Sequence, residues 1–295
     1  LAARYEKQVH VLLRLTSGNQ FGLEEQEIVQ LVRRRAEYPF VCIRGLQFFS
    51  GTQKASLKRL RRELEAVDAL ALSLQSELGF TVHELEFGPG FPVCYFSGQS
   101  FDEPAFLSGF SDLLAGLKCG AKVTLELGRS IAASCGTYLT RVVDVKHNKN
   151  QNYAIVDGGM HQMVYYGQSM AMQLPDCRLF PARAGEPALW NLCGSLCTVN
   201  DILVKQFPAV GLKCGDILAF AGTGAYCMTE GISLFLSRAL PRVVLLLPDG
   251  RTQLVREALA TDRLNTPNYE RTKYYGKADR NFTEPAPRRG LCLLP

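Results

Sequence analysis

Two hydrophobic periods alternate along the first part of the chain. Short runs of consecutive apolar residues have the length of buried strands, and they lie at 9–16, 41–49, 82–87 and 122–127. Between them, apolar residues recur at steps of three and four, which predicts helices at 24–35, from Leu57 to Gly79, and from Asp102, a potential cap, to Gly120. This order of elements predicts parallel strands with helices packed outside them.

The number of strand and helix units limits the possible architectures. Only about four units are present, whereas a closed barrel of this type needs eight. The pattern therefore predicts either an open parallel sheet or a partial (β/α)8 TIM barrel. In the second case, the other half of the barrel would lie upstream of Leu1.

The pattern of apolar and polar residues changes from Gly136 onward. Short β-rich runs are separated by Gly, Pro and Asn, which predicts a mainly antiparallel β domain with strands at 137–145, 153–156, 216–220, 242–247 and 252–256. From Asn265 the chain is polar and basic with little periodicity, and we expect a loosely ordered tail. The expected division is a barrel half at 1–131, a β domain at 132–264 and a tail at 265–295.

Composition narrows the class of protein further. The 295 residues are 47% hydrophobic and 21% charged, with a formal net charge of +5, which is ordinary for a globular protein. Ten cysteines at isolated positions indicate neither a disulfide framework nor a zinc site, so we expect reduced thiols and a cytoplasmic location. No apolar run reaches membrane-spanning length, and the basic clusters at 33–35 and 58–62 are typical of solvated helix faces. We therefore expect neither a membrane nor a nucleic acid as partner.

Candidate chemistry lies where the predicted parallel strands end. The segment 125–129 supplies an acid, a glycine and an arginine, 87–90 supplies a Gly-Pro-Gly loop, and 48–52 supplies two aromatic rings and a hydroxyl. Carboxyl ends of strands are where barrel enzymes keep their sites, and exposed backbone N–H groups can hold a phosphate. Together these features favour a site for an anionic, aromatic cofactor. Taken singly, they could equally be a turn, an ion pair and core phenylalanines.

Six segments, in family order, carry a resemblance. LELGRSIAASCG at 125–136 is similar to the E-x-G-R segment of fold-type III pyridoxal-phosphate decarboxylases, the family of diaminopimelate and ornithine decarboxylases. The others are VLLRLTSGNQFG at 11–22, GLQFFSGTQ at 45–53, VDGGM at 156–160, CGSLCTVND at 193–201 and GDILAFAGTGAY at 215–226. The resemblance implies an alanine-racemase-like TIM barrel, present in part, followed by a C-terminal antiparallel β-barrel domain.

The resemblance also implies a cofactor, pyridoxal 5′-phosphate, and roles for particular residues. Glu126 would face the pyridine nitrogen and keep it protonated, so that the ring can accept electrons. Phe49 would stack on the ring where most relatives use histidine, and Tyr226 would close the phosphate side. The 5′-phosphate would be held by a hydroxyl, backbone N–H groups and one cation, supplied by Thr52, Gly88, Gly90, Gly128 and Arg129.

Catalysis and substrate choice would depend on the cysteine loop of the resemblance. Cys197 would donate a proton to the substrate carbon after decarboxylation of an amino-acid substrate, and the loop would reach the cofactor of a second subunit in a homodimer. Thr198 stands where diamine-forming members have an aspartate, which weakens the case for a basic substrate. Members with threonine there include enzymes that act on amino acids tethered to carrier proteins, so a carrier protein is a candidate partner.

One feature of the family has no counterpart here. The Schiff-base lysine lies in an aromatic-Ala-x-Lys-Ala segment on the first barrel strand, and no lysine of this chain matches it. We expect Lys54 to be a surface residue at a helix start and the chain to be an N-terminally truncated piece. Two alternatives stay open: a non-catalytic decarboxylase-like regulator, which has no chemical need for Glu126, Arg129 or Cys197, and an alanine-racemase-like enzyme.

Overall fold

A computed structural model of the chain describes residues 2–266, and its first part is a four-stranded parallel sheet. The strands are adjacent in sequence order: β1 (Val9–Leu15), β2 (Val41–Phe49), β3 (Glu84–Gly88) and β4 (Lys122–Leu125). Every neighbouring pair is parallel. All four apolar runs predicted from the sequence are therefore strands, and their parallel order is confirmed.

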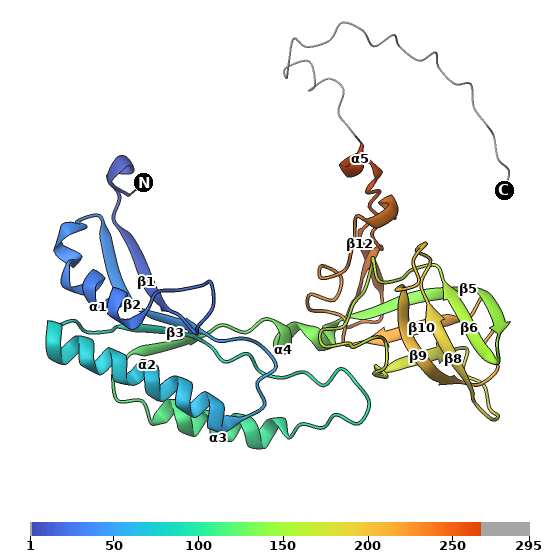
Figure 1. Ribbon diagram of the computed structural model, residues 1–295, viewed down its shortest axis with the longest axis horizontal. Helices are drawn as coiled ribbons and strands as arrows, with labels where there is room; N and C mark the ends of the chain where they lie inside the picture. Colours follow the sequence, from blue (N-terminus) through green and yellow to red (C-terminus); the bar gives the residue numbers. More distant parts are fainter. Residues whose placement is uncertain (1, 267–295) are drawn as a thin grey trace, which may run out of the picture. The chain divides into compact units, whose positions relative to one another are not determined.

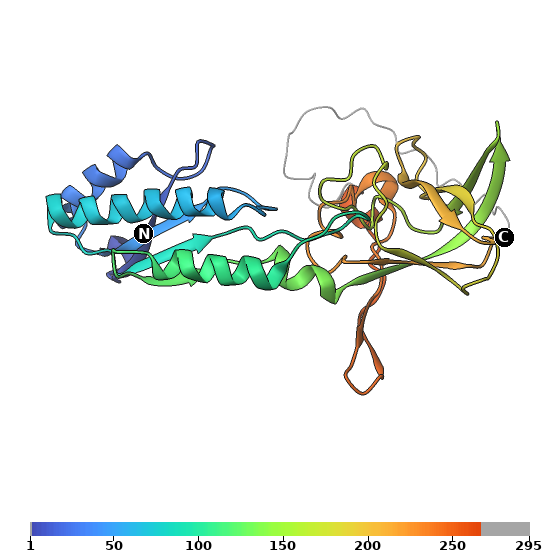
Figure 2. The ribbon, with the colours of Figure 1, turned by 90° about the horizontal axis from the view of Figure 1, so that it is seen from below.

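Helices cover one face of this sheet, where α2 and α3 lie side by side (Figures 1 and 2). These helices are α1 (Glu25–Arg33), α2 (Leu57–Leu78) and α3 (Glu103–Ala115), and the short α4 (Arg129–Ala132) follows β4. Phe87 of β3 is completely buried, with its ring 6.0 Å from that of Phe48 and 6.4 Å from that of Phe110 on α3. Apolar side chains that alternate along the strands thus hold the helices on this face.

The ends of α2 follow the sequence pattern, whereas the end of α3 does not. Ser56 caps α2 by accepting a hydrogen bond from the Arg59 N–H at 3.3 Å, and Gly79 ends it at a φ of +59°. We expected α3 to end at Gly120, but it ends at Ala115. The physical reason is Asp68 of α2, whose carboxylate accepts hydrogen bonds from the backbone N–H groups of the two residues before Gly120, at 2.9–3.1 Å.

The second sheet has six strands, in the order β7-β10-β5-β6-β8-β9. Its pairs are antiparallel except β6 with β8, which are parallel. The bounds are β5 (Thr137–Asn148), β6 (Gln151–Val156), β7 (Cys177–Phe180), β8 (Ala188–Cys193), β9 (Ile202–Ala209) and β10 (Ile217–Ala221). A β-rich second part is confirmed, although the apolar pattern did not predict β7, β8 or β9.

The chain separates into two compact units, Leu1–Phe235 and Leu236–Pro295. The described part of the second unit contains a hairpin of β11 (Val243–Leu246) and β12 (Thr252–Arg256), followed by α5 (Asp262–Asn265). Both hairpin strands were predicted from the sequence. Most of the expected basic tail, at 267–295, lies outside the described residues.

The basic clusters lie on solvated helix faces, as predicted. Every Lys and Arg at 33–35 and 58–62 is exposed, and Arg34 forms an ion pair with Glu37 at 2.6 Å. Exposed ion pairs of this kind contribute at most about 1 kcal/mol to stability.

Within residues 2–266, no helix has both the length and the apolar character needed to cross a membrane.

Candidate functional site

A cavity of about 240 Å³ lies where the parallel strands end. Its walls come from the loops after β2 and β3, from the segment after β4, and from the region after β10. Most of the cofactor-binding residues predicted from the sequence line it: Phe49, Thr52, Gly90, Glu126, Gly128, Arg129 and Tyr226. The fold therefore gathers residues from distant parts of the chain into one hollow.

Arg129 is the central cation of this cavity, and only 7% of it is exposed. Its Nη1 donates to the Tyr95 hydroxyl at 3.2 Å and its Nη2 donates to Glu230 at 3.1 Å. The guanidinium also lies over two aromatic rings, 4.5 Å from the centroid of Tyr166 and 4.9 Å from that of Tyr226. Such contacts hold the guanidinium in position and stabilise its positive charge.

Several of these partners were not predicted from the sequence. As the alternative to a cofactor site, the sequence suggested an ion pair between Glu126 and Arg129, but the carboxylate that pairs with Arg129 is Glu230. Glu230 follows Tyr226 by four residues, and Tyr95 follows the Gly-Pro-Gly loop by five. Neither belongs to a recognisable motif, so the spacing to the predicted residues is the only signal that could have found them.

One nitrogen of the Arg129 guanidinium makes no hydrogen bond within residues 2–266. Nε is buried and has no hydrogen-bond partner within the described part of the chain. A buried donor without a partner costs about 1–3 kcal/mol. An anion bound in the cavity would remove this cost by accepting a hydrogen bond from Nε. Thr52, which carries a hydroxyl, also lines the cavity. The arrangement therefore fits the phosphate of the cofactor that the sequence predicted.

Two glycines allow close packing at this end of the cavity. A Cβ at Gly128 would overlap the Tyr226 hydroxyl, so the tyrosine can approach only because residue 128 has no side chain. Gly90 has a φ of +60°, and a Cβ there would overlap the carbonyl of Gly51. Gly88, which was predicted with them, does not line the cavity and ends β3 behind Phe49.

The polar face of the parallel sheet holds Glu126 in place. Leu46 and Phe48 of β2 are buried under the helices, so Gln47 points to the opposite face. Its Nε2 donates to a carboxylate oxygen of Glu126 at 2.8 Å. Hydrogen bonding to Glu126 raises the pKa of Glu86 on β3, and burial and the charge of Glu126 raise it further. Glu126 thus lies between an amide donor and a second carboxyl group.

We expect Glu86→Gln to stabilise the protein at neutral pH. Because the folded state raises the pKa of Glu86, its favourable contribution is complete below its unfolded pKa of about 4.3 and is lost as the pH rises through the folded value. Unfolding in urea should therefore show the variant more stable than the original at pH 7 and equal to it near pH 4. Glu37→Gln, which removes the exposed ion pair with Arg34 far from Glu86, is the control. Equal stability of Glu86→Gln and the original at pH 7 would contradict the raised pKa of Glu86.

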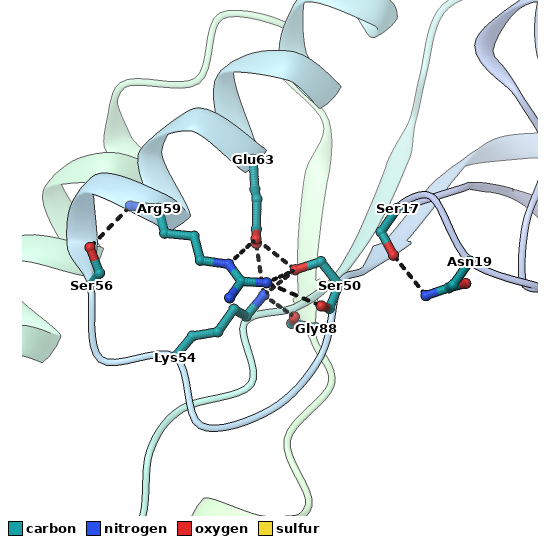
Figure 3. Close-up of polar contacts among 8 residues, drawn as sticks. All are labelled: Ser17, Asn19, Ser50, Lys54, Ser56, Arg59, Glu63 and Gly88. Carbon is teal, nitrogen blue, oxygen red and sulfur yellow. Dashed lines mark hydrogen bonds and ion pairs between the residues drawn. The ribbon is translucent and has the colours of Figure 1, made fainter.

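Lys54 corrects one expectation from the sequence. We expected a surface residue, but its side chain is completely buried. Its Nζ donates to Glu63 of α2 at 2.7 Å and to the Ser50 hydroxyl at 2.9 Å (Figure 3). Burial lowers the pKa of Lys54, and the Glu63 carboxylate partly offsets that effect. The sequence alone did not reveal this pair because Lys54 precedes the predicted helix and carries no apolar pattern.

Cys197 and Thr198 lie elsewhere in the chain, in the loop between β8 and β9. Cys197 is exposed, Thr198 is partly buried, and neither lines the cavity. The loop is held by the buried carboxylate of Asp201, which accepts hydrogen bonds from the N–H groups of Met160 and Leu196, both at 2.8 Å. Within a single chain, the VDGGM and cysteine segments are therefore held together, but Cys197 does not reach the cavity.

Comparisons with known proteins give a matching family model and several relatives. The family model described as "Pyridoxal-dependent decarboxylase, C-terminal sheet domain" matches residues 24–224. The diaminopimelate decarboxylase of Vibrio cholerae is 30% identical over 240 residues, which cover 81% of this chain and 56% of that protein. The L-glutamyl-[BtrI acyl-carrier protein] decarboxylase of Niallia circulans is 26% identical over 255 residues, which cover 82% and 59%.

A solved structure shares the fold. The crystal structure of diaminopimelate decarboxylase from Helicobacter pylori, complexed with L-lysine, matches with a TM-score of 0.76 at 23% identity and covers 89% of this chain and 68% of that one. At this level of identity the likeness concerns the fold alone. The present chain spans about half the length of the curated relatives it matches.

Proposed function

This chain belongs to the pyridoxal-dependent decarboxylase family, and we propose that it acts in the pyridoxal-phosphate-dependent decarboxylation of an amino acid. The observation that carries the proposal is the cavity at the strand ends. It combines a buried guanidinium with a free donor, a hydroxyl, two glycines and an anchored carboxylate. These groups suit a phosphate at one end and a ring nitrogen at the other.

At the phosphate end, the chain would bind the cofactor through four residues. Arg129 would supply charge and the unpartnered Nε donor, and Thr52 would supply a hydroxyl. Gly90 and Gly128, whose missing side chains let Gly51 and Tyr226 pack closely against them, would offer backbone N–H groups to the phosphate. Tyr226, which lies over the guanidinium and against Gly128, would shield the phosphate from water.

At the ring end, Glu126 would hold a proton on the pyridine nitrogen. When bound, the cofactor supplies a ring that accepts the electron pair left by the departing carboxyl group. Gln47 would orient the Glu126 carboxylate through its 2.8 Å hydrogen bond. Phe49, also in the cavity wall, would stack on one face of the ring and keep it in the plane that Glu126 can reach.

We further propose that the active form is a homodimer. Cys197 is exposed and absent from the cavity of its own chain, while its loop is firmly anchored by Asp201. A second subunit would bring its own Cys197 to this cavity, where the thiol would donate a proton to the substrate carbon. This arrangement explains why a rigid loop presents a cysteine to the outside.

For the substrate, we propose an amino acid without a distal ammonium group, carried on a protein. Thr198 beside Cys197 is uncharged and offers no partner to a second ammonium. The relative from Niallia circulans, by its name, acts on a glutamyl group attached to an acyl-carrier protein. In the same proposal, residues 1–131 form the cofactor-binding half of an alanine-racemase-like TIM barrel, and residues 132–264 form a C-terminal antiparallel β-barrel domain.

The test is release of CO2 from amino acids by the product of the complete reading frame that contains this chain, with added pyridoxal phosphate. Free diaminopimelate, lysine, ornithine and glutamate are compared with glutamate loaded on a carrier protein. We expect cofactor-dependent CO2 release, greatest from the tethered substrate and strongly reduced by Cys197→Ala. Racemisation without CO2 release, insensitive to that substitution, would favour the racemase-like alternative. Inactivity without cofactor binding would favour the regulator.

A further inference from the structure

Two loops that line the cavity are fastened to each other by hydrogen bonds. The backbone N–H of Lys54 donates to the carbonyl of Gly90 at 2.9 Å. The carboxamide of Gln53 donates to the carbonyl of Val93 at 2.9 Å and accepts from its N–H at 2.7 Å. The loop after β2, which carries Thr52, is thereby tied to the loop after β3.

The ammonium group of Lys54 lies beneath this connection. Besides Glu63 and Ser50, Nζ contacts the carbonyl of Gly88 at the end of β3, at 3.4 Å (Figure 3). It also lies 5.7 Å from the centre of the Phe87 ring. A single side chain therefore touches α2, the loop after β2 and the last residue of β3.

Charge balance explains why a lysine is tolerated at a position without exposure. Glu63, with 12% of its side chain exposed, accepts hydrogen bonds from the Ser50 hydroxyl at 2.6 Å and from Arg59 at 3.0 Å, in addition to Lys54. A buried ion pair contributes little net stability compared with apolar residues of similar size, because both charges lose their hydration. Stability alone therefore gives no reason for this pair at this place.

We propose that Lys54 is a positioning residue for the phosphate of the cofactor, an inference that rests on the proposed function. Lys54 holds Gly88 and Gly90 against the loop that carries Thr52, so the hydroxyl and the glycine backbone form one cradle opposite Arg129. Glu63 is the counter-charge that keeps the ammonium group in position. Neither side chain lines the cavity, and both act through the loops.

The test compares the affinity of the full chain for pyridoxal phosphate with its affinity for pyridoxal, which lacks the phosphate. The variant Lys54→Met with Glu63→Leu removes both charges together, so no unpaired charge is left buried. We expect its preference for the phosphorylated form to fall about tenfold, with its midpoint of thermal unfolding close to the original. A merely structural pair would change the unfolding midpoint and leave the preference unaltered.

Two controls separate this role from general effects. Arg183→Met with Asp216→Leu replaces another ion pair, in which the carboxylate is buried and two contacts of 2.7 Å join the side chains, and should leave the phosphate preference unchanged. Lys58→Met removes an exposed lysine from α2 and should also leave it unchanged. An unaltered preference in the folded Lys54 and Glu63 variant would overturn the inference while the proposed function stands. If the original chain itself shows no phosphate preference, the proposed cofactor site is wrong and the inference falls with it.

Discussion

Replacing Arg129 by methionine is expected to lower the affinity for pyridoxal phosphate by about a hundredfold. The guanidinium is the buried cation of the cavity, and its Nε has no hydrogen-bond partner among the described residues. A hydrogen bond to a charged group contributes about 1.5–3 kcal/mol, and each 1.4 kcal/mol corresponds to a tenfold change in affinity. Methionine keeps much of the apolar stem of the side chain but supplies neither charge nor donor.

The measurement is a fluorescence or calorimetric titration with pyridoxal phosphate and, in parallel, with pyridoxal. The affinity for pyridoxal should fall much less, because it lacks the group that Arg129 contacts. Glu230→Gln is the matched control, since it removes the ion pair at 3.1 Å but leaves the guanidinium and its Tyr95 contact in place. An equal loss of affinity for both ligands would show that Arg129 stabilises its contacts with Tyr166, Tyr226 and Glu230 and does not bind the phosphate.

Replacing Asp201 by alanine is expected to lower the free energy of unfolding by about 3 kcal/mol. Only 2% of Asp201 is exposed, and its two oxygens each accept a backbone hydrogen bond, from Met160 and from Leu196. Alanine leaves both N–H groups buried without a partner, at a cost of about 1–3 kcal/mol each. The two segments that these bonds join, VDGGM and the cysteine loop, should be held together less firmly.

Urea unfolding followed by the fluorescence of Trp190 on β8, the only tryptophan, would measure this change. Asp201→Asn provides the graded control, because its single acceptor oxygen can keep one of the two hydrogen bonds; it should lose roughly half as much stability. An alanine variant as stable as the original would contradict this, because it would show that the two N–H groups do not depend on the carboxylate. The position of the loop that carries Cys197 would then not be explained by Asp201.

The sequence alone predicted those features that depend on neighbouring residues. Helix α2 begins at Leu57 and is stopped by Gly79 as expected, because a regular apolar spacing and a glycine stop depend on residues close in sequence. The four parallel strands follow from apolar runs of strand length. The cavity residues followed from where these strands end, together with the resemblance to one family.

Tertiary structure alone decided the features that depend on contacts between distant residues. Asp68 of α2 ends α3 early, Glu230 and not Glu126 pairs with Arg129, and Lys54 is buried against Glu63. In each case a charged side chain is placed by a partner at least nine residues away, and no local pattern encodes that partner. Local spacing determines where a helix or strand begins and ends, whereas burial and charge pairing are settled only when the elements pack, because both depend on which groups exclude water from each other.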